Sequence, residues 1–153
     1  MPLLPVSHHE QLQQSDCLAA CAAMVLDYLG FPAEYDTLLS RLQVGEYGAL
    51  IGNLRFLEKF GVKVLIARGE IETLRSCLAR ALPPIAFVDT NELSYWNAAS
   101  YHAVVVIGIE GNRIFINDPA FADAPKKISV DEFMLAWIGL EQFYALIERA
   151  DKE

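Results

Sequence analysis

The sequence predicts an α+β domain in which a helical N-terminal half packs on a mostly antiparallel C-terminal sheet. In the first half of the chain, apolar residues recur mainly at helical spacing. In the second half, β-branched and aromatic runs are separated by turn residues. With 153 residues, 54% of them hydrophobic, the chain fits one domain with a substantial core. We therefore expect residues 1–153 to form a single domain without repeats or linkers.

The first predicted helix spans residues 18–29. This run is rich in alanine and leucine and ends before Gly30, the usual residue at a helix C-cap, while Ser15 or Asp16 could serve as the N-cap. Four further segments have helical spacing or helix-start signals: residues 33–43, 50–60, 70–81 and 131–139. The glycines of residues 45–48 lack the lysine and hydroxyl residue of a phosphate loop, so this segment is interpreted as a turn between helices.

The predicted strands follow Gly61 and fill most of the second half. They are residues 62–67, 85–89, 101–109, 113–117 and 142–147. Residues 90–100 and 119–125 are interpreted as loops. The active site is expected between the helical half and this sheet.

Cys17 stands immediately before the first predicted helix. A thiol attacks a carbonyl as the thiolate, which is favoured by a nearby base and by the N–H groups at a helix N-terminus. Cys17 is therefore the candidate nucleophile. Cys21 and Cys77 are interpreted as core residues, because free cysteine behaves as a small buried hydrophobe. His8 and His9 are interpreted as part of a solvated arm, and neither a metal nor a cofactor is expected.

His102 and Asp118 flank the hairpin predicted from residues 101–109 and 113–117. If Glu110, Gly111 and Asn112 form a three-residue loop, Asp118 becomes the diagonal same-face neighbour of His102. A two-residue loop would place Asp118 on the opposite face unless a bulge restored the register. In the first arrangement His102 would act as base and then acid, and Asp118 would fix its tautomer.

The quoted residues resemble the bacteriocin-processing cysteine peptidases, papain-like domains that cut leader peptides after a double glycine. The resemblance rests on residues 11–21, on His102 with the valines after it, and on residues 117–120, and residues 131–139 resemble the last helix of that family. It implies that Gln11, six residues before Cys17, helps to form the oxyanion hole. The chain departs from the family at Leu18, where glycine often follows the nucleophile, and we expect neither the membrane helices nor the ATPase domain of an exporter within residues 1–153.

The leading functional hypothesis is a cysteine peptidase that cleaves a peptide bond through a Cys17 thioester, after a double-glycine leader. Leu18, Tyr95 and Trp96 are the candidate substrate-binding residues because they are bulky and would narrow the cleft. Two alternatives stay open. One is an acyl or peptidyl transferase on the same scaffold, and the other is a catalytically weak domain that binds a leader peptide, against which the intact Cys17 and His102 argue.

Charge and composition restrict the partners. A net charge of −8 and a sequence pI near 4.8 argue against nucleic acid or an anionic membrane surface and suit a cationic peptide. The N-terminus lacks the features of a signal peptide, and no run is apolar enough to span a bilayer. Three cysteines, an odd number, fit a reducing compartment. We therefore expect a cytoplasmic protein whose partners are a precursor peptide and, as a candidate, a separate exporter.

Overall fold

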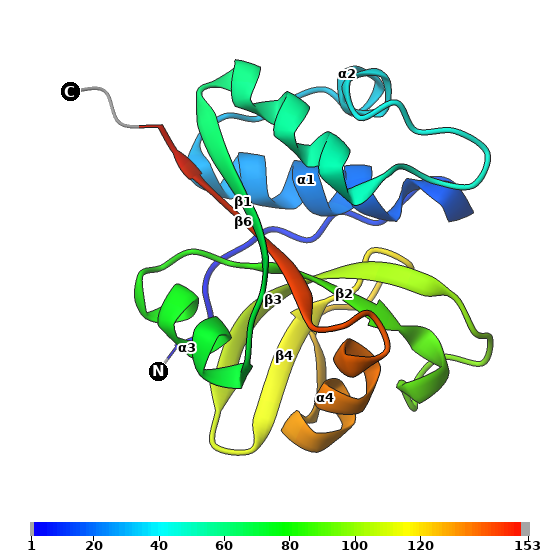
Figure 1. Ribbon diagram of the computed structural model, residues 1–153, viewed down its shortest axis with the longest axis vertical. Helices are drawn as coiled ribbons and strands as arrows, with labels where there is room; N and C mark the ends of the chain where they lie inside the picture. The colour runs from blue at the N-terminus through cyan, green and yellow to red at the C-terminus, as the bar shows by residue number, and fades with distance from the viewer. Residues whose placement is uncertain (1, 151–153) are drawn as a thin grey trace.

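The computed structural model describes residues 2–150 of the chain. Its elements in chain order are η1 (Gln14–Asp16), α1 (Cys17–Leu29), α2 (Tyr35–Arg41), η2 (Ile51–Phe60), β1 (Val62–Arg68), α3 (Ile71–Ala79), β2 (Ile85–Asp89), η3 (Thr90–Glu92), β3 (Tyr101–Glu110), β4 (Arg113–Asn117), β5 (Lys126–Ser129), α4 (Val130–Ile138) and β6 (Phe143–Arg149), where η marks a 3-10 helix. Figure 1 shows their arrangement.

The strands form one six-stranded sheet in the order β1-β6-β2-β3-β4-β5, and every neighbouring pair is antiparallel. This confirms the predicted α+β class and the antiparallel sheet. The last strand, β6, lies between β1 and β2, so the C-terminal part of the chain joins the strand that follows the helical half to the rest of the sheet. No helix in residues 2–150 has both the length and the apolar character needed to cross a membrane.

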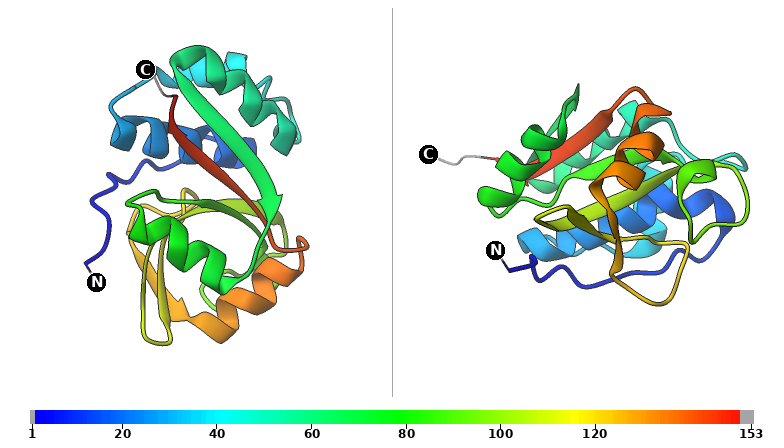
Figure 2. Two further views of the ribbon diagram at one scale, coloured as in Figure 1. Left: turned by 60° about the vertical axis from the view of Figure 1, so that its left-hand side comes forward. Right: turned by 90° about the horizontal axis from the view of Figure 1, so that it is seen from below.

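Helices cover both faces of the sheet. On one face α1, α2 and η2 bury Leu26, Leu38 and Leu54 against inward residues of β1, β2, β3 and β6. On the other face α3 and α4 bury Leu74 and Trp137 against the alternate strand residues. Figures 1 and 2 show α1 and α2 apart from α3 and α4, with the sheet between them. Because successive strand residues point to opposite faces, each strand of the middle of the sheet contributes to both cores.

Several element boundaries differ from the sequence prediction. Residues 50–60 form a ten-residue 3-10 helix, η2, and β5 lies in a segment for which no strand was predicted. Neither Ser15 nor Asp16 caps α1 through its side chain, because the chain enters α1 directly from the 3-10 turn η1. The predicted C-cap is confirmed, since Gly30 adopts the left-handed conformation at φ 93°.

The β3–β4 hairpin corrects the predicted three-residue loop. Glu110 pairs with Arg113, so the loop has only Gly111 and Asn112, and Ile107 is an extra residue between the pairs formed by Val106 and Gly108. This bulge restores the register that the shorter loop would have shifted, and Val105 pairs with Asn117. Asp118 therefore returns to the face of His102, by the alternative route considered from the sequence.

The N-terminal arm packs on this bulge. The backbone N–H of Leu4 donates to the carbonyl of Ile107 at 2.9 Å. A Cβ on Gly108 would lie 2.4 Å from a methyl carbon of Leu3, so glycine allows the arm to approach the strand closely. The bulge carbonyl thus has a partner outside the sheet, which compensates for the interrupted strand pairing.

Candidate active site

Cys17 is the first residue of α1 and is partly exposed. Its position at the start of a 13-residue helix places it beside N–H groups that have no partner within the helix. The other two cysteines, Cys21 and Cys77, are buried, and burial raises the pKa of both thiols. Of the three cysteines, Cys17 is therefore the one placed to react with a substrate.

His102 is the second residue of β3, and its side chain is only 3% exposed. Its Nε2 lies 2.6 Å from Oδ1 of Asp118, and the Cys17 thiol lines the same pocket as the imidazole. Strand β3 thus brings the imidazole to the N-terminus of α1. The structure thus brings the three predicted triad residues to one place: the imidazole is hydrogen-bonded to the Asp118 carboxylate and lines one pocket together with Cys17.

Asp118 follows β4 and is completely buried. Its Oδ1 accepts from His102 and from the backbone N–H of Ala120 at 3.0 Å. Its Oδ2 accepts from the Tyr95 hydroxyl at 2.8 Å and from the Trp96 indole N–H at 2.9 Å. Four donors therefore fix this carboxylate, and they stabilise its charge away from water.

The ionisation states of His102 and Asp118 follow from their burial and their hydrogen bonds. Burial disfavours the charged imidazole, but the hydrogen bond to Asp118 and the nearby Cys17 thiol outweigh it and raise the pKa of His102 from 6.5 to about 9. Burial likewise disfavours the Asp118 carboxylate, yet its hydrogen bonds with His102, Trp96 and Ala120 lower the pKa of Asp118. The favoured state near neutral pH is an imidazolium next to an ionised carboxylate.

This arrangement predicts the alkaline limit of activity. Because the folded-state pKa of His102 lies above its ordinary value, the imidazolium persists from neutral pH up to about pH 9 and is lost above it. We expect kcat/KM for a cleaved peptide to fall as the pH rises through about 9. Asp118→Asn, which removes the charge that supports the imidazolium, should move this limit to lower pH. A wild-type limit in the ordinary histidine range would contradict the assignment.

Gln11 lies in the segment before η1. Its backbone N–H donates to the carbonyl of Pro119 at 2.7 Å, which fastens this segment to the loop after Asp118. The side-chain Nε2 is 3.3 Å from the carbonyl of Gln14, and Oε1 is buried without a hydrogen-bond partner among the described residues. A long hydrogen bond on one side and a buried unsatisfied oxygen on the other leave the amide weakly held. The Gln11 side chain does not line the pocket that contains Cys17 and His102.

The catalytic pocket has a volume of about 360 Å³ and contains both Cys17 and His102. Its other lining residues are Leu18, Tyr47, Gly48, Ala49, Leu50, Ile51, Phe87, Tyr101, Ala103 and Leu140. Leu18 is thus where the sequence predicted it. Tyr95 and Trp96 are not, because their polar atoms bind Asp118 and the Trp96 ring packs on His102 with centroids 4.9 Å apart. These two residues support the triad instead of forming a wall of the cleft.

Sequence reasoning missed the other wall of the pocket. Residues 45–48 do form a turn, but the turn presents Tyr47, which is 95% exposed, at the mouth of the pocket, and Leu50 is 75% exposed beside it. A large aromatic in a turn followed by exposed apolar residues was the available signal, since such residues favour a binding role over packing.

Asp16 is a second residue whose role the sequence left open. It is only 2% exposed and accepts a hydrogen bond from the Tyr35 hydroxyl at 3.1 Å, while that hydroxyl also lies 3.3 Å from the backbone nitrogen of Leu12. Burial and the Asp16 carboxylate raise the pKa of Tyr35 to about 12, and the hydrogen bond from Leu12 opposes this shift. The N-terminus of α2 is thereby linked to the segment that carries Gln11 and Cys17.

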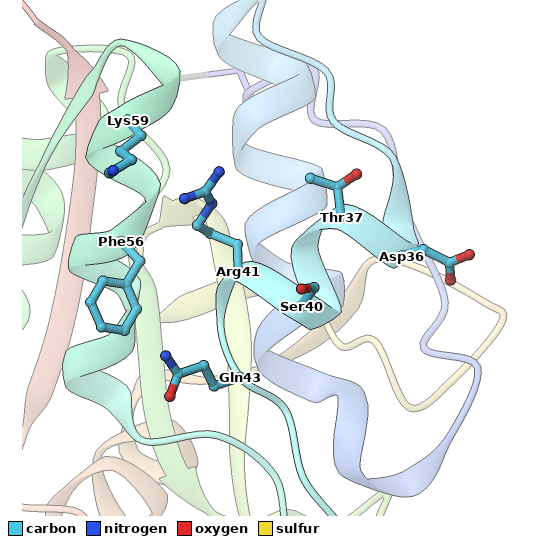
Figure 3. A pocket seen from close by; sticks show the side chains of 7 residues that line it. All are labelled: Asp36, Thr37, Ser40, Arg41, Gln43, Phe56 and Lys59. Atoms are coloured by element: carbon cyan, nitrogen blue, oxygen red, sulfur yellow. The ribbon is translucent and has the colours of Figure 1, made fainter.

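Another large surface groove lies between α2 and η2, away from the triad (Figure 3). Arg41, with its guanidinium 5.7 Å from the Phe60 ring centroid, and Lys59 contribute its cations, and Asp36 lies toward its other end. It contains no cysteine or histidine, so it offers neither a thiol nucleophile nor an imidazole base. Within residues 2–150, no cluster of three His, Cys, Asp or Glu side chains has the geometry to hold a metal ion.

The sequence is similar to that of a known protein family over most of its length. A family model described as the peptidase C39 family matches residues 6–147. A comparison with curated protein sequences found no significant match.

Several solved structures share the fold. A double-glycine-motif protease from an AMS/PCAT transporter, solved with its leader peptide, has a TM-score of 0.77 and 24% identity, over 97% of this chain and 94% of that one. A C39-like peptidase from Bacillus anthracis has a TM-score of 0.79 and 18% identity, over 99% and 100%. The peptidase domain of Streptococcus ComA, a bifunctional ABC transporter of a quorum-sensing pathway, has a TM-score of 0.76 and 20% identity, over 92% and 96%.

Proposed function

The chain belongs to the peptidase C39 family of cysteine peptidases, and from this premise we propose that it cleaves a precursor peptide after a double-glycine leader. The observation that carries the proposal is the hydrogen-bonded pair of His102 and Asp118 at a pocket with apolar walls that Cys17 also lines. One similar structure is described as a double-glycine-motif protease with its leader peptide, which supports this class of substrate.

In the proposed reaction the Cys17 thiolate attacks the carbonyl carbon of the scissile peptide bond. The resulting oxyanion accepts hydrogen bonds from the backbone N–H of Cys17 and from the Gln11 amide after it turns toward the pocket. His102 gives its proton to the leaving nitrogen, the C–N bond breaks, and a thioester to Cys17 remains. A water molecule, deprotonated by His102, then attacks the thioester, the C–S bond breaks, and the leader leaves as a free acid while the Cys17 thiolate and the His102 imidazolium are restored. Asp118 holds the imidazole throughout and keeps its own charge.

The shape of the pocket favours small residues on the acyl side of the cut. Leu18 follows Cys17 in the chain and lines the pocket, and Tyr47 and Leu140 line it from the segments between α2 and η2 and between α4 and β6. A glycine pair has no side chains to collide with these groups, whereas branched residues would. Selectivity would then come from steric exclusion.

This preference is tested with two peptides that share one leader sequence and differ only in ending in Gly-Gly or Val-Val. We expect the Gly-Gly peptide to be cleaved at least about 100-fold faster, which corresponds to roughly 3 kcal/mol of steric discrimination. Cleavage is measured by mass spectrometry of both products. Leu18→Ala should reduce the ratio of the Gly-Gly to the Val-Val cleavage rate, because the smaller side chain leaves more room for valine in the pocket. Equal rates for the two peptides would refute double-glycine selectivity while leaving thiol catalysis intact.

The proposal also concerns the partner and the compartment. One similar structure is the peptidase domain of an ABC transporter. We therefore propose a separate exporter as the partner that removes the mature peptide. A free catalytic thiol needs a reducing environment, so the proposed compartment is the cytoplasm.

A further inference from the structure

A second pocket continues the catalytic pocket toward the outer end of β2 and β3. It has a volume of about 580 Å³ and is lined by Asp89, Asn91, Ala99, Ser100 and Tyr101. Tyr101 lines both pockets. Asp89 pairs with Tyr101, and two residues further in Phe87 pairs with Ala103, which is part of the catalytic pocket. Side chains two residues apart share a face of the sheet, so the two pockets lie along one surface.

The carboxylate of Asp89 lies in an electronegative corner of this second pocket. Its Oδ1 accepts from the backbone N–H of Asn91 at 2.9 Å, and no ion pair within residues 2–150 involves it. It packs against Gly139 at the end of α4, where an added Cβ would lie 2.7 Å from Asp89 Cβ and 3.4 Å from Oδ2. The C-terminus of a helix carries partial negative charge. Two negative groups thus adjoin, an arrangement that a cation would stabilise.

The surroundings of Asp89 supply no such cation from the local sequence. Residues 81–112 form β2, η3, the following loop and β3, and they contain no lysine or arginine. Tyr101, which is 74% exposed, lines the pocket next to Asp89 as its partner on the neighbouring strand, and aromatic rings attract ammonium and guanidinium groups. The pocket therefore combines a carboxylate, a helix C-terminus and an aromatic ring, all of which favour a positively charged side chain.

The chemistry of the triad indicates which part of a peptide reaches this pocket. Tyr101 and His102 both line the catalytic pocket, and the imidazole delivers its proton to the leaving nitrogen. The amine side of the scissile bond therefore lies on the imidazole side of the sulfur. On the basis of the proposed hydrolysis, we infer that the Asp89–Tyr101 pocket is a subsite for a lysine or arginine side chain on the amine side of the cut. The preferred substrates are then precursors whose mature part begins with a basic segment.

The test uses synthetic peptides of one leader sequence ending in Gly-Gly, with lysine, norleucine or glutamate at each of the first three positions after the cut. Norleucine keeps the aliphatic chain of lysine without its charge. We expect lysine to exceed norleucine in kcat/KM by about 5-fold at one position, as for a partly exposed ion pair of about 1 kcal/mol, and glutamate to be the poorest. Equal rates at all three positions would overturn the inference.

Variants of Asp89 distinguish the effect of its own carboxylate from the effect of the overall negative charge of the protein. In Asp89→Asn the amide oxygen still caps Asn91, so the fold is retained, and the lysine-to-norleucine ratio should fall to about 1. Asp89→Lys should reverse the preference toward glutamate. Asp36→Asn makes the same chemical change in the distant groove of Figure 3 and should keep the wild-type ratio. A fall in the Asp36 variant equal to that in the Asp89 variant would show a general charge effect and would refute the subsite.

A binding measurement distinguishes failure of the subsite from failure of the proposed function. Tripeptide amides Lys-Ala-Ala and norleucine-Ala-Ala are titrated into the Cys17→Ala protein and followed by amide NMR shifts. We expect saturable shifts at Ser100 and Tyr101 for the lysine peptide only, and their loss in the additional variant Asp89→Asn. If no Gly-Gly peptide is cleaved, the proposed function fails and the titration still decides the subsite. Identical shifts for both tripeptides would refute it.

Discussion

Replacing Cys17 with alanine should abolish peptide cleavage, with a fall in kcat/KM of at least about 10⁴-fold. No other described residue can form the thioester, because Cys21 and Cys77 are buried and the pKa of each thiol is raised. Without the thiol, the remaining hydrogen-bond donors can bind the peptide but cannot split its hydrolysis into two steps. The loss should appear in kcat, measured by mass spectrometry with the Gly-Gly leader peptide.

The matched control is Cys77→Ala, which removes a thiol from α3 on the opposite face of the sheet. This variant should keep wild-type turnover. Both variants should keep the far-ultraviolet circular dichroism of the wild type, since Cys17 is only partly buried at the first residue of α1. Iodoacetamide should label Cys17 well before the other two cysteines in the folded wild type. Retention of activity in Cys17→Ala, or equal labelling of all three thiols, would show that the nucleophile lies elsewhere.

Much of this site could be predicted from the sequence because its parts depend on local structure. The helix after Cys17 and the strand that begins at Tyr101 have strong patterns and clear ends, so the position of each reactive residue on its element was predictable. Whether His102 and Asp118 lie on the same face depended on the register of the β3–β4 hairpin. The structure reaches the expected register by a two-residue loop and a bulge at Ile107, which a sequence pattern does not distinguish from a three-residue loop.

The rest of the site depends on contacts between distant segments. Tyr95 and Trp96 precede His102 closely in sequence, which suggested a cleft wall, but their hydroxyl and indole groups turn to the buried carboxylate of Asp118. A completely buried charge requires donors, and Tyr and Trp each carry one polar group that needs a partner when buried. The wall around Tyr47 comes from a turn between α2 and η2, which only tertiary packing brings to the sulfur.

Gln11→Ala is expected to lower kcat by about 10²–10³-fold with little change in KM, the usual effect of losing one oxyanion donor. The amide is well placed to move, because its 3.3 Å bond to the Gln14 carbonyl is long and its Oε1 is buried without a partner among the described residues. Turning toward a developing oxyanion exchanges these weak contacts for a charge-assisted hydrogen bond. The control is Gln13→Ala, which truncates an exposed glutamine of the same segment and should leave kcat unchanged.

Alkylation distinguishes an oxyanion donor from a residue that positions the sulfur. The attack of the Cys17 thiolate on iodoacetamide displaces iodide at a saturated carbon and creates no oxyanion, so Gln11→Ala should be alkylated at the wild-type rate. His102→Ala should lose both rapid alkylation and turnover, because the thiolate loses its imidazolium partner. If Gln11→Ala slows alkylation as much as turnover, Gln11 acts by holding the segment before α1, which its backbone bond to Pro119 already fastens. If it changes neither rate, the second oxyanion donor is a different group.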